Sequence, residues 1–298
     1  MPIALPAQML EIAGADAIAF AQAQFCNDVV ALPTGHWQWN AWLSPQGRVR
    51  CMFILLRDAD DRLRLLLRGG DAEIVRAALA RFVFRAKLSL RTLVDTQVLG
   101  CNEAEALASL ANLPAADALV RHGDSVGLRL PGPAQRWLLL QAPPTPAIVA
   151  IASAEALNRW RLDDIRAGLP ELGPALEDQW LPQWLGLGRL RAISVRKGCY
   201  PGQEVMARLH FKGGNKRGLY RLQLDRMALP APGTPLFGNN QEAGAVVMSA
   251  WSGAGHAEAL AVLADTAAAA SLCIGSRRSD TTTADEIKVV SGFAREHP

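Results

Sequence analysis

Residues 196–218, RKGCYPGQEVMARLHFKGGNKRG, differ in character from the rest of a chain that is rich in alanine and leucine. A cysteine, Cys199, stands between Gly198 and Gly202. Glycine permits positive φ and Pro201 fixes its own φ, so the segment predicts a rigid, tight loop. The helix-forming stretch that follows, 203–209, places the thiol near a helix N-terminus.

Two interpretations of Cys199 are open at this point. The positive end of the following helix, together with Arg196 and Lys197, favours the thiolate and predicts a reactive or ligand-binding cysteine with a lowered thiol pKa. A free cysteine is, however, most often a small buried apolar side chain. None of the five histidines stands in a recognisable cysteine-protease motif. The loop also lacks the glycine spacing of a Walker or dinucleotide-binding loop.

The same part of the chain is strongly cationic. Between Arg189 and Arg221 there are nine Lys and Arg residues and one acid, Glu204, whereas the remainder carries 22 cations and 27 anions. The piece KGGNKRG (212–218) leaves backbone N–H groups uncovered, which suits a carboxylate or phosphate tail, or an RNA backbone. A solvated charged face is the competing interpretation. Few aromatic residues interleave with the cations, which counts against single-stranded RNA.

Composition narrows the class of protein. A chain of 298 residues, half of them apolar, is expected to bury a substantial core and to form two or three compact units. Its five cysteines are far apart and odd in number, so we expect free thiols in a reducing compartment and no zinc site. The N-terminus lacks a signal-peptide pattern, and we expect a cytoplasmic monomer that makes no use of a membrane.

Periodicity and turn signals predict an α+β fold with mainly antiparallel sheet, followed by a small all-β barrel after residue 216. Asp71 is the predicted cap of the second helix. A proline cluster, 143–146, follows the second mixed segment. The expected helices are 16–25, 72–84, 103–110, 203–209 and one that ends within the stretch 161–173; the expected strands before the barrel are 37–43, 49–56, 63–67, 126–130 and 137–140.

The octapeptide 197–204, KGCYPGQE, resembles the KGCYxGQE signature of the YgfZ-type folate-binding proteins, which are implicated in iron-sulfur cluster assembly or repair and in tRNA modification. Further blocks of that family occur in the same order along most of the chain. They are AQAQFCNDV (21–29), LSPQGRV (43–49), IRAGLP (165–170), LPQ (181–183) and GNKRGLY (214–220).

The resemblance implies the fold of the glycine-cleavage T-protein, a tetrahydrofolate-dependent aminomethyltransferase. That fold is a three-part ring with folate in a central channel: two mixed α/β subdomains with antiparallel sheets, and a C-terminal β-barrel. We therefore expect a folate-binding-type region at 1–216, whose second, discontinuous subdomain lies near 88–142, and a barrel at 217–298.

The resemblance also implies site residues, without a metal site. The residues expected to carry the chemistry are Cys199, Lys197 as the group that tunes it, Gln203 and Glu204. The residues expected to bind tetrahydrofolate or a related folate are Asn27, Asp28, Trp160, Arg166, Gly198, Tyr200, Gly202, Lys216 and Arg217. For Trp160, a core position is an equally good interpretation.

Three departures from the transferase pattern affect the expected mechanism. Cys51 and Met52 stand where the transferases have an acidic pair, and neither side chain is a carboxylate base. Arg166 replaces a glutamate that accepts hydrogen bonds from the pterin, and arginine has no acceptor. In the stretch 184–196, cations that include Arg191 replace neutral residues, which indicates an altered ligand charge.

Three functional hypotheses remain. The leading one is a folate-site protein that assists iron-sulfur cluster assembly or repair, and thereby tRNA-modifying enzymes, without aminomethyl transfer; its partners are a folate-like anion and iron-sulfur enzymes or assembly factors. The second is a tetrahydrofolate-dependent one-carbon transferase or demethylase with another base, such as Asp28. The third is an RNA-binding module that uses the basic segment 189–221. In the leading hypothesis, the loop places the Cys199 thiol beside an electropositive hollow, a cavity that binds a flat acidic ligand.

Overall fold

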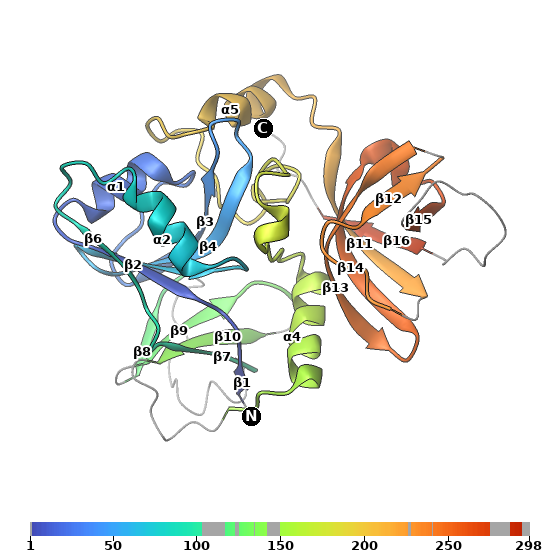
Figure 1. Ribbon diagram of the computed structural model, residues 1–298, viewed down its shortest axis with the longest axis horizontal. Helices are drawn as coiled ribbons and strands as arrows, with labels where there is room; N and C mark the ends of the chain where they lie inside the picture. Colours follow the sequence, from blue (N-terminus) through green and yellow to red (C-terminus); the bar gives the residue numbers. More distant parts are fainter. Residues whose placement is uncertain are drawn as a thin grey trace.

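The computed structural model describes residues 2–102, 117–122, 125–133, 135–141, 150–225, 228–239, 241–274 and 287–293. Two open sheets and one closed barrel make up the fold, and Figure 1 shows α4 (Ala154–Ala167) between the lower sheet and the barrel. The predicted class, α+β with antiparallel sheets and a C-terminal barrel, is confirmed. No helix in these ranges is long and apolar enough to cross a membrane.

The first sheet has the strand order β3-β4-β5-β2-β6 and is antiparallel throughout. Its strands are β2 (Met9–Ala13), β3 (His36–Leu43), β4 (Val49–Ala59), β5 (Arg62–Leu67) and β6 (Ser89–Thr92). Successive side chains of a strand point to opposite faces. In β4, Met52 and Ile54 therefore join the large central core, whereas Cys51 and Phe53 join the core beneath the helices.

Two helices lie against this sheet, α1 (Ala17–Gln24) and α2 (Ala72–Ala80). Asp71 caps α2 as predicted, since its carboxylate accepts from the backbone N–H groups of Glu73 and Ile74 at 2.8 and 3.1 Å. The predicted extension of this helix to residue 84 is wrong. Beyond Ala80 the chain makes tighter i→i+3 turn bonds where Phe82 packs edge-on against Trp42.

The second sheet has the order β1-β7-β10-β9-β8. Its strands are β1 (Ile3–Ala4), β7 (Gln97–Asn102), β8 (Val120–His122), β9 (Ser125–Leu130) and β10 (Arg136–Gln141). The predicted strands at 126–130 and 137–140 are thus confirmed within two residues. The predicted helix at 103–110 and the proline cluster at 143–146 lie outside the described residues.

A buried ion cluster connects both sheets to α4. The carboxylate of Asp164 accepts from Arg68 at 2.7 Å and from Arg136 at 2.8 Å, and all three side chains are almost fully buried. The guanidinium of Arg136 also lies 4.6 Å from the ring centroid of Trp160. Breaking such a pair leaves an uncompensated buried charge, so the cluster fixes the relative position of the three elements.

The C-terminal strands close into a barrel in the order β11-β14-β13-β12-β15-β16. They are β11 (Arg217–Asp225), β12 (Pro235–Gly238), β13 (Gln241–Gly253), β14 (His256–Ala264), β15 (Leu272–Ile274) and β16 (Ile287–Gly292). Asn158 on α4 extends this sheet, because its side-chain amide donates to the carbonyl of Trp251 and accepts from its N–H, both at 2.8 Å. The remaining elements are α5 (Gln203–Lys212), η1 (Pro174–Leu176) and η2 (Asp265–Ala267).

Candidate functional site: a central cavity and a cysteine loop

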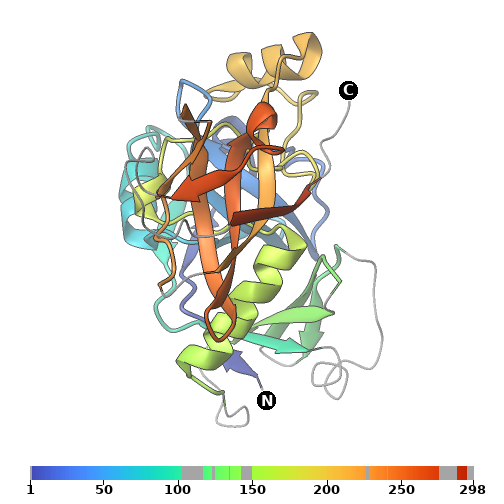
Figure 2. The same cartoon turned by 90° about the vertical axis from the view of Figure 1, so that its right-hand side faces the viewer.

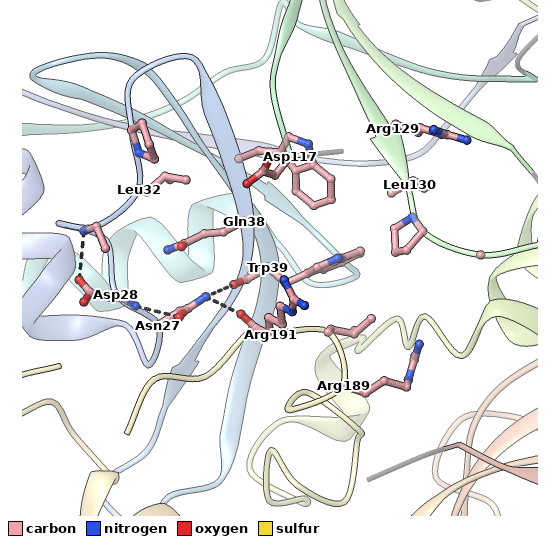
Figure 3. A pocket seen from close by; sticks show the side chains of 16 residues that line it. Asn27, Asp28, Leu32, Gln38, Trp39, Asp117, Arg129, Leu130, Arg189 and Arg191 are labelled. Atoms are coloured by element: carbon pink, nitrogen blue, oxygen red, sulfur yellow. Dashed lines mark hydrogen bonds between the residues drawn. The ribbon is translucent and has the colours of Figure 1, made fainter. Parts of the chain in front are cut away.

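A cavity of about 760 Å³ lies between the two sheets and the segment before the cysteine loop. Its walls come from residues 27–28 and 31–33, strand residues 37–39, Asp117, residues 129–132 and residues 189–191, as Figure 3 shows. This volume falls in the range of pockets that bind cofactor-sized molecules, about 300–1,000 Å³. The cavity is therefore the leading ligand site in the described part of the chain.

Asn27 joins two walls of the cavity. Its side-chain amide donates to the carbonyl of Trp39 at 2.9 Å and to that of Arg191 at 2.7 Å. Arg191 has a positive φ of 52°, a conformation that is strained for a residue with a side chain. The bond from Asn27 helps to hold that backbone, so the family block around residue 27 fixes the wall that carries Arg191.

A buried amide anchors Asn27 in turn. The side-chain oxygen of Asn40, which is fully buried, accepts from the N–H groups of Asn27 at 3.0 Å and Ala41 at 2.9 Å. The neighbouring carboxylate of Asp28 accepts from the Gln22 side chain at 3.1 Å and from the Ala31 N–H at 3.2 Å. Asp28 thus reaches the cavity with one oxygen already engaged.

Three side-chain nitrogens of residues that line the cavity are buried and have no hydrogen-bond partner among the described residues. They are the indole N–H groups of Trp37 and Trp39 and the side-chain amide nitrogen of Gln38. Both tryptophans are more than nine-tenths buried, and their rings pack edge to face at 6.0 Å. A buried donor without a partner costs free energy. These nitrogens have almost no accessible surface, so a ligand in the cavity would reach them only after a movement of the side chains.

The charges at the cavity are mixed, with an excess of cations. Arg129, Arg189 and Arg191 line it together with the acids Asp28 and Asp117 (Figure 3). Arg189 is held in place, since its guanidinium donates to the carbonyl of Gly168 at 2.6 Å, and burial lowers its pKa. The cavity can therefore accept a molecule that has both an acidic part and hydrogen-bond donors.

The signature loop lies apart from this cavity. None of residues 196–202 belongs to the described lining, so the predicted hollow beside the thiol is not where the large cavity lies. Cys199 is exposed, and the interpretation of this cysteine as a buried apolar side chain is therefore wrong. The predicted activation of its thiol stays a prediction.

Two glycines from different family blocks meet beneath this loop. Gly202 has a φ of 81° and caps α5, and a Cβ there would lie 2.5 Å from the carbonyl oxygen of Ser44 and 2.7 Å from the Cα of Gly47. Gly47, at the tip of the β3–β4 hairpin, also has a positive φ, 74°. Gly198 has no positive φ and open space around it, so the conformational reason predicted for both loop glycines holds for Gly202 alone.

Lys197 points into the protein. Its ammonium donates to the carbonyl oxygens of Gln22 at 2.5 Å, Phe25 and Asn27 at 3.1 Å, which follow or end α1. It also lies 4.8 Å from the ring centroid of Tyr200, and burial lowers its pKa to about 8. These carbonyls occupy all three ammonium donors, so the group ties the loop to the cavity wall at Asn27.

The amino-acid sequence is similar to those of known bacterial proteins over most of its length. The chain is 32% identical over 249 residues to the tRNA-modifying protein YgfZ of Yersinia enterocolitica, across 76% of this chain and 72% of that one. It is 31% identical over 235 residues to the protein of the same name from Escherichia coli, across 76% and 72% of the two chains. The chain belongs to the YgfZ family.

The structural comparison confirms the expected relationship in fold. The YgfZ-family chain superposes on the glycine cleavage system aminomethyltransferase T of Bartonella henselae with a TM-score of 0.69 and 16% identity, over 97% of this chain and 84% of that one. At this identity the match concerns the fold alone. No protein-family model matches the chain.

Two residues that the YgfZ resemblance placed around folate lie outside the large cavity. Trp160 is buried between the guanidinium of Arg136 and the backbone of Gly100, and it borders a small cavity of about 50 Å³. Its ring lies so close to Gly100 that a Cβ added to that glycine would come within 2.6 Å of the ring. Arg166 forms an ion pair at 2.7 Å with Glu258 of the barrel. The structure therefore brings Asn27 and Asp28 to the large cavity, but neither Trp160 nor Arg166.

The other predicted residues of this YgfZ-family site cluster around α5. Tyr200 is buried and its hydroxyl donates to the carbonyl of Ser194 at 3.3 Å. Gln203 donates to the Lys197 carbonyl at 3.4 Å, which closes the loop, while Glu204 is exposed. Lys216 is exposed and the Arg217 guanidinium lies 5.5 Å from the ring centroid of Trp184.

Sequence reasoning missed most of the cavity wall. Trp37, Gln38 and Trp39 were predicted only as strand residues, and Arg129 carried no signal. The cations at 189–191 were noticed as a departure from the family pattern and do line the cavity. The alternation in β3, where both tryptophans face one side, was the one local pattern that pointed to the aromatic wall.

Proposed function

We propose that this YgfZ-family protein binds a folate-like anionic molecule in the cavity between residues 27–39, 129–132 and 189–191. With Cys199 as its reactive group, it assists the assembly or repair of iron-sulfur enzymes, including enzymes that modify tRNA. The observation that carries the proposal is the cavity of about 760 Å³ itself, which is lined by Trp37 and Trp39 together with three arginines. The relatives' name, tRNA-modifying protein, supports the second part.

A reduced folate fits the chemistry of this wall. The indole rings of Trp37 and Trp39 suit a flat heterocycle. Asp28 and Asp117 supply the acceptors that Arg166 lacks, and would take the N–H groups of a pterin. Arg129, Arg189 and Arg191 would hold carboxylates, for which guanidinium groups have the matching geometry. When bound, a reduced folate supplies a one-carbon carrier.

Aminomethyl transfer is not part of this proposal. Cys51 and Met52 are 3% and 0% exposed on β4, inside two different cores, and burial raises the pKa of the Cys51 thiol to about 12. Neither side chain can act as the base that the transferases place there. Asp28 keeps a transferase as the second candidate, because it lines the cavity and its hydrogen bonds with the described residues engage one of its two oxygens.

Binding is tested by titrating the full-length protein with 5-formyltetrahydrofolate and following heat release and tryptophan fluorescence. We expect saturable binding that weakens at least about threefold in Trp39→Phe, since the smaller ring removes part of the aromatic wall of the cavity. Trp251→Phe, which alters a half-buried tryptophan of the barrel, is the matched control. Absence of binding by the unmodified protein would refute the folate-like ligand.

The role of the thiol is tested separately in a strain that lacks the protein. Cys199→Ala is expected to fail to restore the activity of an iron-sulfur enzyme that modifies tRNA, whereas Cys273→Ala in the barrel should restore it. Full rescue by Cys199→Ala would remove this cysteine from the mechanism. Formation of methylene-tetrahydrofolate from amine donors, abolished by Asp28→Asn, would instead favour the transferase.

A further inference from the structure

The outer side of α5 and the segments beside it form a cationic surface, here called the α5 face: Arg196, Arg208, Phe211, Lys212 and Lys216. All five residues are exposed. The one acid in the same segment is Glu204, while the chain outside 189–221 carries more anions than cations. Such a local excess produces a positive potential that favours a polyanionic partner.

The helix projects from the body of the protein on a fixed base. Met206 is its one buried residue, and Figure 2 shows α5 standing out at the top of the molecule. Its first turn is held by the close approach of Gly202 to the β3–β4 hairpin and by the bond from Gln183 to the Met206 carbonyl at 3.1 Å. The exposed side chains of α5 therefore lie on a helix whose position is fixed, and they are away from the cavity.

An aromatic side chain stands among these cations. Phe211 is 70% exposed, one of the most exposed large apolar side chains described, and its ring packs edge to face with His210 at 4.9 Å. Arg208, Phe211 and Lys212 are spaced i, i+3 and i+4, so they share one side of the helix. The sequence indicated few aromatic residues among these cations, and Phe211 is one that the structure leaves exposed.

The chain beyond the helix is open. Gly213 and Gly214 have φ values of 70° and 86°, and no atom lies within 4 Å of the position of an added Cβ. A second backbone can approach such a segment closely. Lys212 and Lys216 flank it, so phosphate groups that pass the glycines would meet a cation on each side.

We propose that the α5 face binds an unpaired stretch of RNA, with a base stacked on Phe211 and phosphates at Arg208, Lys212 and Lys216. Cations that track a backbone together with an exposed aromatic ring are the features by which proteins hold single-stranded nucleic acid. An acidic peptide would use the cations but has no flat base for the ring. This function goes beyond the cavity ligand, and it does not depend on folate binding.

The test measures fluorescence anisotropy of a labelled mixed-sequence RNA of about twelve nucleotides with the full-length protein, over a range of salt concentrations. We expect Arg208→Gln/Lys212→Gln to weaken binding at least about tenfold and to make the slope of log K against log salt shallower by about 1.4, the value for two lost contacts on a single strand. Phe211→Ala should weaken binding at least about fivefold with the slope unchanged.

Charge-matched controls distinguish this face from general attraction. Arg159→Gln/Lys288→Gln removes the same charge from exposed positions on α4 and β16 and should change affinity less than about twofold. Glu204→Gln should strengthen RNA binding, because Glu204 lies one helical turn before Arg208 on the same side of α5 and its negative charge repels phosphate. The 5-formyltetrahydrofolate titration should be unaltered by Arg208→Gln/Lys212→Gln and by Phe211→Ala, so failure here is separate from failure at the cavity.

Several outcomes would overturn the proposal. The first is the absence of RNA binding at about 50 mM salt, where phosphate contacts are strongest. The second is an equal loss of RNA affinity in Arg208→Gln/Lys212→Gln and in Arg159→Gln/Lys288→Gln, and the third is an unchanged affinity of Phe211→Ala. The fourth is binding of double-stranded RNA or poly-glutamate that is as tight as binding of the single strand.

Discussion

The ammonium group of Lys197 donates a hydrogen bond to the carbonyl oxygen of Asn27, 3.1 Å away, and so ties the cysteine loop to the wall of the cavity. Asn27 in turn holds the carbonyl of Arg191 on the opposite side at 2.7 Å. The exposed thiol and the cavity are therefore separate sites that share one hydrogen-bonded support. A change at either end of this support is expected to disturb both.

Replacement of Lys197 by methionine should destabilise the protein by about 2–4 kcal/mol, because three carbonyls would lose a charged donor in a buried position. Urea unfolding measures this, and Lys212→Met on the exposed end of α5 should cost less than about 0.5 kcal/mol. Equal effects of the two variants would contradict a structural role for Lys197.

The two glycines of the signature should respond differently to alanine. Gly202→Ala combines a positive φ of 81° with a Cβ 2.5 Å from the Ser44 carbonyl oxygen, so we expect a loss of at least about 2 kcal/mol. Gly198→Ala meets no atom within 4 Å and should be close to neutral. Thermal unfolding compares them, and a larger loss for Gly198→Ala would show that the loop has another conformation.

Acid should weaken the contact between α4 and the barrel. Burial raises the pKa of Glu258, but hydrogen bonds from Arg166 and Arg221 outweigh it and hold the pKa below its ordinary value of 4.5. The Glu258 carboxylate therefore binds a proton more readily in the unfolded state than in the folded state. The stabilisation from its ion pairs is fully present above pH 4.5 and is lost as the pH falls through the lower pKa of the folded state.

Unfolding free energies measured between pH 7 and pH 3 should therefore converge for the unmodified protein and Glu258→Gln as the pH falls. Glu155→Gln, which alters an exposed ion pair with Arg159 on α4, is the control and should follow the unmodified protein. A constant difference between Glu258→Gln and the unmodified protein over this range would contradict the assignment.

Thiol labelling should separate the five cysteines, all of which lie in the described part of the chain. Cys26, Cys51 and Cys101 are buried, and burial raises the pKa of Cys26 and Cys51 to about 12. Cys199 is exposed and Cys273 is half-buried. When the native protein reacts with a maleimide, mass spectrometry should therefore show one thiol that is labelled fast. This fast labelling should be absent from Cys199→Ser.

Local pattern was sufficient for much of the fold. The cap at Asp71, the hairpin turn before Val49, the helix after Gly202 and the barrel strands from Arg217 onward follow from propensity, alternation and turn residues. These signals act over a few residues. Where they failed, beyond Ala80, the chain makes turn bonds in place of helical bonds, and Phe82 packs there against Trp42, forty residues away.

The sequence by itself determined the family, the order of elements, the tight bend at Gly202 and the presence of a cationic segment. Only the tertiary structure decided where the side chains point. It turned Lys197 inward to the carbonyls that end α1, paired Arg166 with Glu258, left Phe211 in solvent and assembled the cavity from segments that begin at residues 27, 37, 129 and 189. A side chain's partner depends on packing between distant segments, and no local pattern carries that information.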